Sequence, residues 1–176
     1  MAVGQVRPGY ELWRPNREKG GSATMKWLIV LLLLATAVLA AVITVGGWSV
    51  MKGGSGMGIV CAIYALLYLL FAYRVARWSR GVLPLSAALS MILAILCAVG
   101  AESWFERDKS GFTEPLIPSS AVGVLVIALG LLQIVVIAAA LYGFNQNWHV
   151  EEERPIGSGE DYGAGAAPGN GAPQPA

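Results

Sequence analysis

Long runs of apolar residues alternate with short polar segments along this chain of 176 residues. A helix needs about 20 apolar residues to cross the roughly 30 Å hydrocarbon core of a bilayer. We therefore predict an all-α, polytopic membrane protein in which four transmembrane helices form an antiparallel bundle. The runs that predict these helices contain no Asp, Glu, Lys, Arg or His and cover residues 27–45, 57–73, 82–99 and 121–144.

The first run has a second interpretation as a secretory signal. Its leucines, isoleucines and valines favour membrane insertion by roughly 5 kcal/mol. Met25 and Lys26 before the run, and residues 38–40 at its end, resemble a cleavable signal peptide. The 24 mostly polar residues that precede the run, and its spanning length, favour a helix that is retained. Cleavage would leave three spans instead of four.

The basic residues predict the orientation of the spans. Nine Lys or Arg residues lie in residues 1–26, in the 74–81 loop and in the C-terminal tail, whereas three lie in the other two loops. Because cytoplasmic loops are enriched in Lys and Arg, we expect both termini in the cytoplasm. A multi-pass protein of the plasma membrane is the expected location.

Five of the six tryptophans lie at or just beyond an end of a predicted span. An indole ring prefers the interface, where its apolar body is half buried and its N–H group meets water. These positions support the predicted span ends, and they are Trp27, Trp48, Trp78, Trp104 and Trp148.

The two ends of the chain differ in composition from the predicted transmembrane domain at residues 25–148. Residues 1–24 are basic, contain Pro and Gly, and show no helical periodicity. Residues 149–176 are dominated by Gly, Ala, Pro and polar residues, which bury too little apolar area to fold. We therefore expect a flexible N-terminal tail and a disordered C-terminal tail.

Composition excludes several classes of function. The chain is 56% hydrophobic and 13% charged, compared with about 25% charged residues in soluble domains. A net charge of +1 gives no reason to expect a nucleic-acid partner. The spans carry no ionisable side chain for a proton or ion relay, and the only histidine, His149, follows the fourth span. We expect no metal, no cofactor and no enzymatic activity.

A modest polar layer is expected near the middle of the membrane. Thr36, Tyr64, Ser90 and Gln133 lie close to the midpoints of their spans. Small residues at helical spacing accompany most of them, which favours close helix packing and interhelical hydrogen bonds. The layer is therefore interpreted mainly as structural, and contact with a small lipophilic ligand is the alternative.

Two further groups of residues have candidate roles. Cys61 and Cys97 lie near the outer ends of the second and third spans, which a short loop joins. We expect these helices to pack antiparallel with the thiols at similar depth, either as small apolar groups or as a disulfide. Arg74, Arg77 and Arg80 lie on the inner side, where they mark topology and attract anionic lipid headgroups.

A bundle without chemistry or ion ligands, and with small-residue stripes, favours a structural or accessory membrane protein. Its expected partners are the lipid bilayer and other membrane proteins, or a second copy of the chain. The alternative function is permeation of a small solute or binding of a lipophilic ligand at the polar layer. A membrane enzyme is the third possibility.

Overall fold

The structure is a computed structural model that describes residues 6, 8–51, 54–106 and 115–157. Helices account for 77% of it. The elements in chain order are β1 (Tyr10–Trp13), α1 (Pro15–Glu18), α2 (Gly20–Gly47), the short 3₁₀ helix η1 (Trp48–Val50), α3 (Gly54–Ala76), α4 (Val82–Phe105), α5 (Ser119–Asn145) and β2 (Glu152–Pro155).

Helices α2, α3, α4 and α5 are each long and apolar enough to cross a membrane, and in the described residues they agree in number with the predicted spans. The helices extend beyond the apolar runs. Helix α2 begins at Gly20, and α4 continues to Phe105. A run defined by hydropathy ends where polar side chains begin, whereas backbone hydrogen bonding continues into the interface. Helix α3 ends at Ala76, so Arg74 lies within the helix and Arg77 just beyond it.

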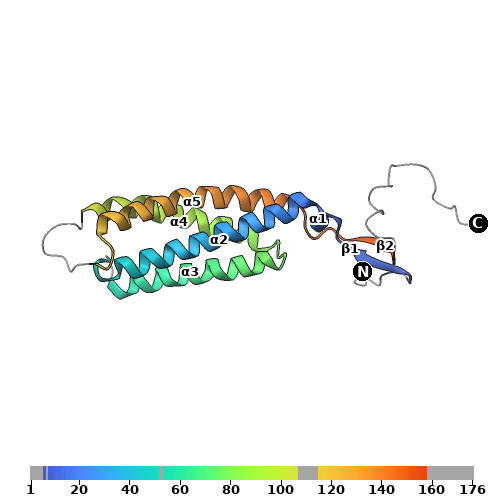
Figure 1. Cartoon of the computed structure of the whole chain (residues 1–176), viewed down its shortest axis with the longest axis horizontal. Helices are drawn as coiled ribbons and strands as arrows, with labels where there is room; N and C mark the ends of the chain where they lie inside the picture. Colours follow the sequence, from blue (N-terminus) through green and yellow to red (C-terminus); the bar gives the residue numbers. More distant parts are fainter. Residues whose placement is uncertain (1–5, 7, 52–53, 107–114, 158–176) are drawn as a thin grey trace, which may run out of the picture.

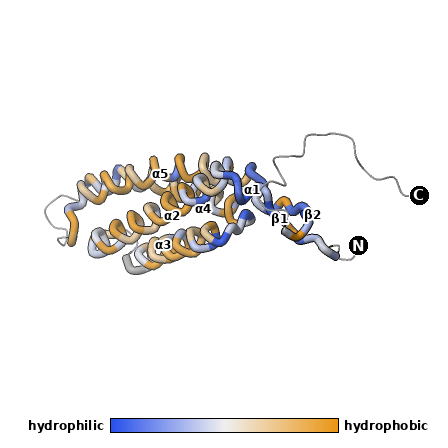
Figure 2. Tube along the Cα trace, turned by 45° about the vertical axis from the view of Figure 1, so that its right-hand side comes forward, coloured by the Kyte–Doolittle hydropathy of each residue, from blue (hydrophilic) through white to orange (hydrophobic). Residues whose placement is uncertain are grey.

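The four long helices lie side by side, and both terminal strands lie at one end of them (Figure 1). Hydrophilic residues gather around α1 at that same end, whereas the long helices are mostly apolar (Figure 2).

Helix α4 packs extensively on α5, and α2 packs on both α3 and α5. Helices α3 and α4 make few contacts with each other in the described residues, although a short loop joins them. These two helices therefore pack less tightly on each other than the α4–α5 and α2–α3 pairs do.

Small residues allow close approaches in the helix bundle. A Cβ atom added at Gly47 would lie 2.4 Å from the ring of Trp104, and one at Gly130 would lie 3.1 Å from the Cβ atom of Cys97. The contact with Gly47 helps to bury Trp104 within the protein. Trp148 is fully buried as well, at the other end of the bundle. These two tryptophans therefore pack inside the protein, whereas Trp27 remains exposed as the interfacial interpretation expects.

The terminal segments fold together where flexible tails were expected. Strand β1 pairs with β2 in an antiparallel ribbon, with Tyr10 opposite Pro155 and Trp13 opposite Glu152. The prediction of unstructured tails is therefore wrong for residues 10–24 and 149–157. Residues 158–176 of the predicted C-terminal tail lie outside the described residues. The error arises because each strand has too little apolar area to fold alone, and only the partner at the far end of the chain completes the pairing.

Candidate functional site

The predicted polar layer forms one hydrogen-bonded chain that joins all four long helices. The hydroxyl group of Tyr68 on α3 donates to Oε1 of Gln133 on α5 at 2.9 Å and lies 2.9 Å from Oγ of Ser90 on α4. Nε2 of Gln133 donates to Oγ1 of Thr36 on α2 at 3.3 Å. All four of these side chains are fully buried. The structure thus brings together Thr36, Ser90 and Gln133, as the sequence predicts.

Tyr68, and not Tyr64, supplies the tyrosine of this layer. Side chains on a helix tilt toward its N-terminus, so a tyrosine hydroxyl lies about one turn before its own Cα atom. The Tyr68 hydroxyl is therefore placed at the depth that residue 64 has along α3. A prediction based on Cα depth selects the wrong tyrosine, although the spacing of four residues puts both on one helix face.

The layer has no hydrogen-bond donor left for a ligand. With Ser90 donating to Tyr68, each hydroxyl hydrogen in the chain has one acceptor. Thr36 completes the chain by donating to the carbonyl oxygen of Leu32 at 3.0 Å. The second N–H bond of Gln133 points to the carbonyl oxygen of Leu129 at 3.1 Å. A fully satisfied buried network stabilises and specifies packing, so these residues act as structural groups.

A cavity of about 360 Å³ lies next to the polar layer, between α3 and α4, with α2 and α5 also contributing to its wall. Its inner end is formed by residues one turn from the layer, including Ala40, Tyr64 and Leu93. Its other end reaches Met57 and Ser103. The few contacts between α3 and α4 give a physical reason for this space.

The wall of the cavity is almost wholly apolar, and its hydroxyl groups are mostly engaged. Thr44 donates to the carbonyl oxygen of Ala40 at 2.6 Å, and Ser103 donates to that of Gly100 at 2.9 Å. Within the described residues, the Tyr64 hydroxyl has no hydrogen bond to another group. Tyr64 thus differs from the other three predicted layer residues because its polar atom is not used by the fold.

The two cysteines also line this cavity, one from α3 and one from α4. Both Cys61 and Cys97 are free thiols, so the structure does not form the disulfide that was the less favoured interpretation. In the described part of the chain, no group of three or more His, Cys, Asp or Glu side chains is placed to hold a metal ion.

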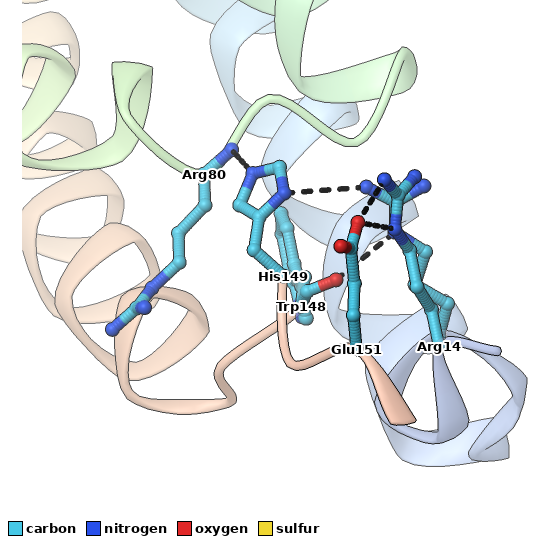
Figure 3. Close-up of polar contacts among 6 residues, drawn as sticks. Arg14, Arg80, Trp148, His149 and Glu151 are labelled. Atoms are coloured by element: carbon cyan, nitrogen blue, oxygen red, sulfur yellow. Dashed lines mark hydrogen bonds and ion pairs between the residues drawn. The ribbon is translucent and has the colours of Figure 1, made fainter. Parts of the chain in front are cut away.

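The opposite end of the bundle carries a polar cluster that ties together three segments of the chain (Figure 3). Arg14, before α1, forms an ion pair with Glu151, and its Nε atom donates to Oε1 of Glu151 at 2.8 Å. Arg17 of α1 donates to the carbonyl oxygen of Trp148 at 3.0 Å. The backbone N–H of Arg80, in the loop between α3 and α4, donates to Nε2 of His149 at 3.3 Å.

His149 is the centre of this cluster, and its surroundings favour the neutral imidazole. Desolvation lowers the pKa of His149, and the positive charges of Arg17, Arg14 and Arg80 lower it further, while Glu151 opposes them. Since Nε2 accepts from the backbone, the proton of the neutral ring belongs on Nδ1. Nδ1 lies 3.4 Å from Nη2 of Arg17, and a neutral imidazole can accept a hydrogen bond at only one of its two nitrogens.

The three arginines predicted to meet lipid headgroups have different environments. Arg74 and Arg77 are exposed. Arg80 instead donates from Nε to the carbonyl oxygen of Phe144 at 2.8 Å, and its guanidinium group lies 4.1 Å from the centre of the Phe144 ring. Arg80 therefore caps the end of α5, which leaves Arg74 and Arg77 as the exposed members of the set.

No protein-family model, curated protein or solved structure gives a significant match to this chain.

Proposed function

We propose that this protein is a multi-pass membrane protein that binds a lipophilic molecule in the cavity between α3 and α4. The observation that carries the proposal is the cavity itself. Its volume of about 360 Å³ falls in the range of roughly 300–1,000 Å³ that small-molecule pockets have. The polar layer closes its inner end and is not the binding group. The proposed role is binding without a catalytic step, because the described wall offers the two thiols no neighbouring base.

The proposal includes an orientation. We place α2 to α5 as an antiparallel bundle in the plasma membrane, with the β1–β2 ribbon and the His149 cluster in the cytoplasm. The excess of Lys and Arg at that end supports this orientation. The cavity then lies in the half of the bilayer that is farther from the cytoplasm.

Labelling of single cysteines tests the orientation. In a Cys61→Ala/Cys97→Ala background, Leu116→Cys should react with an impermeant maleimide in intact cells, because Leu116 is 79% exposed before α5. Ile156→Cys, at a position that is 68% exposed near the terminal ribbon, should react only after permeabilisation. Labelling of Ile156→Cys from outside would refute the orientation. An N-terminal tag tests the number of spans. A tag that stays on the mature chain indicates four spans, whereas its loss indicates a cleaved signal and three spans.

Filling the cavity should abolish ligand binding without harming the fold. Gly100 lines the cavity, and a Cβ atom added there would meet nothing within 4 Å. Gly100→Leu therefore has space for its side chain and gains helix propensity, about 0.5–1 kcal/mol. We expect the wild type to retain a lipophilic molecule through purification in mild detergent, and Gly100→Leu to retain at least tenfold less. Extraction with organic solvent followed by mass spectrometry measures both.

Ala98→Leu is the matched control for this substitution. Ala98 lies on the same helix, is exposed and does not line the cavity. The same lipophilic molecule should co-purify with Ala98→Leu as with the wild type. Equal retention by the wild type and Gly100→Leu, or no lipophilic molecule in any sample, would refute the proposed function.

An accessory role that binds other membrane proteins is the second candidate. The His149 cluster favours this role. Residues 14–17, residues 148–151 and the 77–81 loop form one charged surface there, and a lipid-binding cavity does not require such a surface. A partner of this surface should bind in fixed stoichiometry and be lost on Arg14→Glu, which breaks the ion pair with Glu151. Full retention of such a partner by Arg14→Glu would argue against this surface.

A further inference from the structure

We infer that the ligand of the cavity is an uncharged lipid chain with one hydrogen-bonding oxygen, and that the Tyr64 hydroxyl binds this oxygen. The inference rests on the proposed function and names the chemical class of the ligand. It follows from the length of the cavity, the charge of its wall and the Tyr64 hydroxyl, which has no hydrogen bond within the described residues.

The length of the cavity favours an elongated ligand. Its wall on α4 extends from Leu93 to Ser103, which corresponds to about 15 Å along the helix axis. An extended hydrocarbon chain matches this length.

The composition of the wall favours an uncharged ligand. None of the described residues that line the cavity is charged, and a carboxylate or ammonium group in this region would have no counter-ion. The wall is instead formed by side chains such as Ile43, Val60, Leu96 and Leu129, which favour hydrocarbon. The ligand is therefore neutral over the length that enters the cavity.

Tyr64 supplies the one specific polar contact. Thr44 and Ser103 donate to carbonyl oxygens of their own helices, whereas the Tyr64 hydroxyl has no hydrogen bond within the described residues. Since side chains tilt toward the helix N-terminus, this hydroxyl points from α3 toward the Met57 end of the cavity. A phenol hydroxyl left without a partner in hydrocarbon is costly, so an oxygen on the ligand completes it.

The ligand reaches the cavity from the membrane, through the gap between α3 and α4. These two helices make few contacts with each other, whereas the α4–α5 and α2–α3 interfaces are extensive. Entry by this route requires no separation of the tightly packed pairs. A molecule dissolved in the bilayer therefore has direct access to Tyr64.

Binding of chosen probes to the purified, delipidated chain tests the inference. Oleyl alcohol should stabilise the protein against heat in a saturable way, octadecene more weakly, and ionised oleate least. Tyr64→Phe should weaken the binding of oleyl alcohol by about 2- to 12-fold, the loss expected for one hydrogen bond. Octadecene should bind both proteins equally, because it has no oxygen.

Tyr73→Phe is the matched control, because Tyr73 lies on the same helix and is 59% exposed. It should bind oleyl alcohol as the wild type does. If Tyr64→Phe binds oleyl alcohol as tightly as the wild type, or if oleate binds best, the inference about the ligand is refuted. Loss of all binding in Gly100→Leu would in that case leave the proposed function standing. If no probe binds the wild type and nothing co-purifies with it, the proposed function itself is refuted.

Discussion

Replacing Gln133 with leucine should lower the free energy of unfolding by about 1–3 kcal/mol, because it removes two interhelical hydrogen bonds of roughly 0.6–1.7 kcal/mol each. Gln133 accepts from Tyr68 on α3 and donates to Thr36 on α2, so one side chain on α5 holds two other helices. The leucine side chain is of similar size, and the loss therefore reflects the polar contacts. Reversible unfolding in mixed micelles with increasing denaturing detergent measures the change.

A double-mutant cycle with Tyr68→Phe should show that the two residues act together. Because they share a hydrogen bond at 2.9 Å, the double variant should lose less stability than the sum of the single variants. Ser86→Ala is the matched control, since Ser86 is fully buried but its Oγ atom donates to Leu83 of its own helix. Strict additivity, or an equal loss in Ser86→Ala, would show that the layer does not couple the helices.

Acidification to about pH 5 should release the C-terminal segment that contains His149 from α1 and the 77–81 loop. At neutral pH the neutral ring accepts from the backbone N–H of Arg80. Protonation removes that acceptor and adds a positive charge beside Arg14, Arg17 and Arg80. After correction for the intrinsic pH dependence, amide hydrogen exchange of residues 148–156 should therefore be several-fold faster at about pH 5 than at neutral pH.

The direction of this pH effect follows from the lowered pKa of His149 in the folded protein. An unfolded histidine has a pKa of about 6.5, so below that value the open segment binds the proton more readily than the closed one. The neutral His149 ring therefore contributes fully to the stability of the docked C-terminal segment above about pH 6.5. This contribution is lost as the pH falls from there through the pKa of His149 in the folded protein.

His149→Gln is the control for the acid response. A glutamine side chain keeps an oxygen that can accept from the Arg80 N–H group but does not titrate. Exchange in this variant should follow the intrinsic pH dependence alone. An acid response in His149→Gln as large as that of the wild type would assign the effect to another group, with the Arg14–Glu151 ion pair as the first candidate.

The terminal ribbon shows why local composition misleads at the ends of this chain. Residues 10–13 and 152–155 lie more than a hundred positions apart, and each segment is only four residues long, so neither predicts a strand by its own pattern. They pair because the four long helices return the chain to its starting end (Figure 1). Arg154 then forms an ion pair with Glu11 across the ribbon at 2.7 Å, a contact that cannot be read from either segment alone.

The candidate site was predictable in part. Thr36, Ser90 and Gln133 could be found because polar residues are rare in apolar runs and tend to face helix interfaces. The tyrosine assignment failed because it depends on how far a side chain extends along the helix axis. The cavity had no sequence signal, since its wall uses the same apolar residues as the surfaces that face lipid.

The sequence by itself determined that four long apolar helices form, because only a continuous apolar helix satisfies its backbone in hydrocarbon. Its charge distribution also predicts one orientation, which the labelling experiment will test. Tertiary structure alone decided which helices touch. The tight α4–α5 pair depends on where the small residues Gly123 and Gly130 of α5 meet Phe105 and Cys97 of α4, and that matching is a property of two surfaces together. The cavity beside Tyr64 exists because α3 and α4, neighbours in sequence, meet through few contacts, of which the Tyr68–Ser90 hydrogen bond is one.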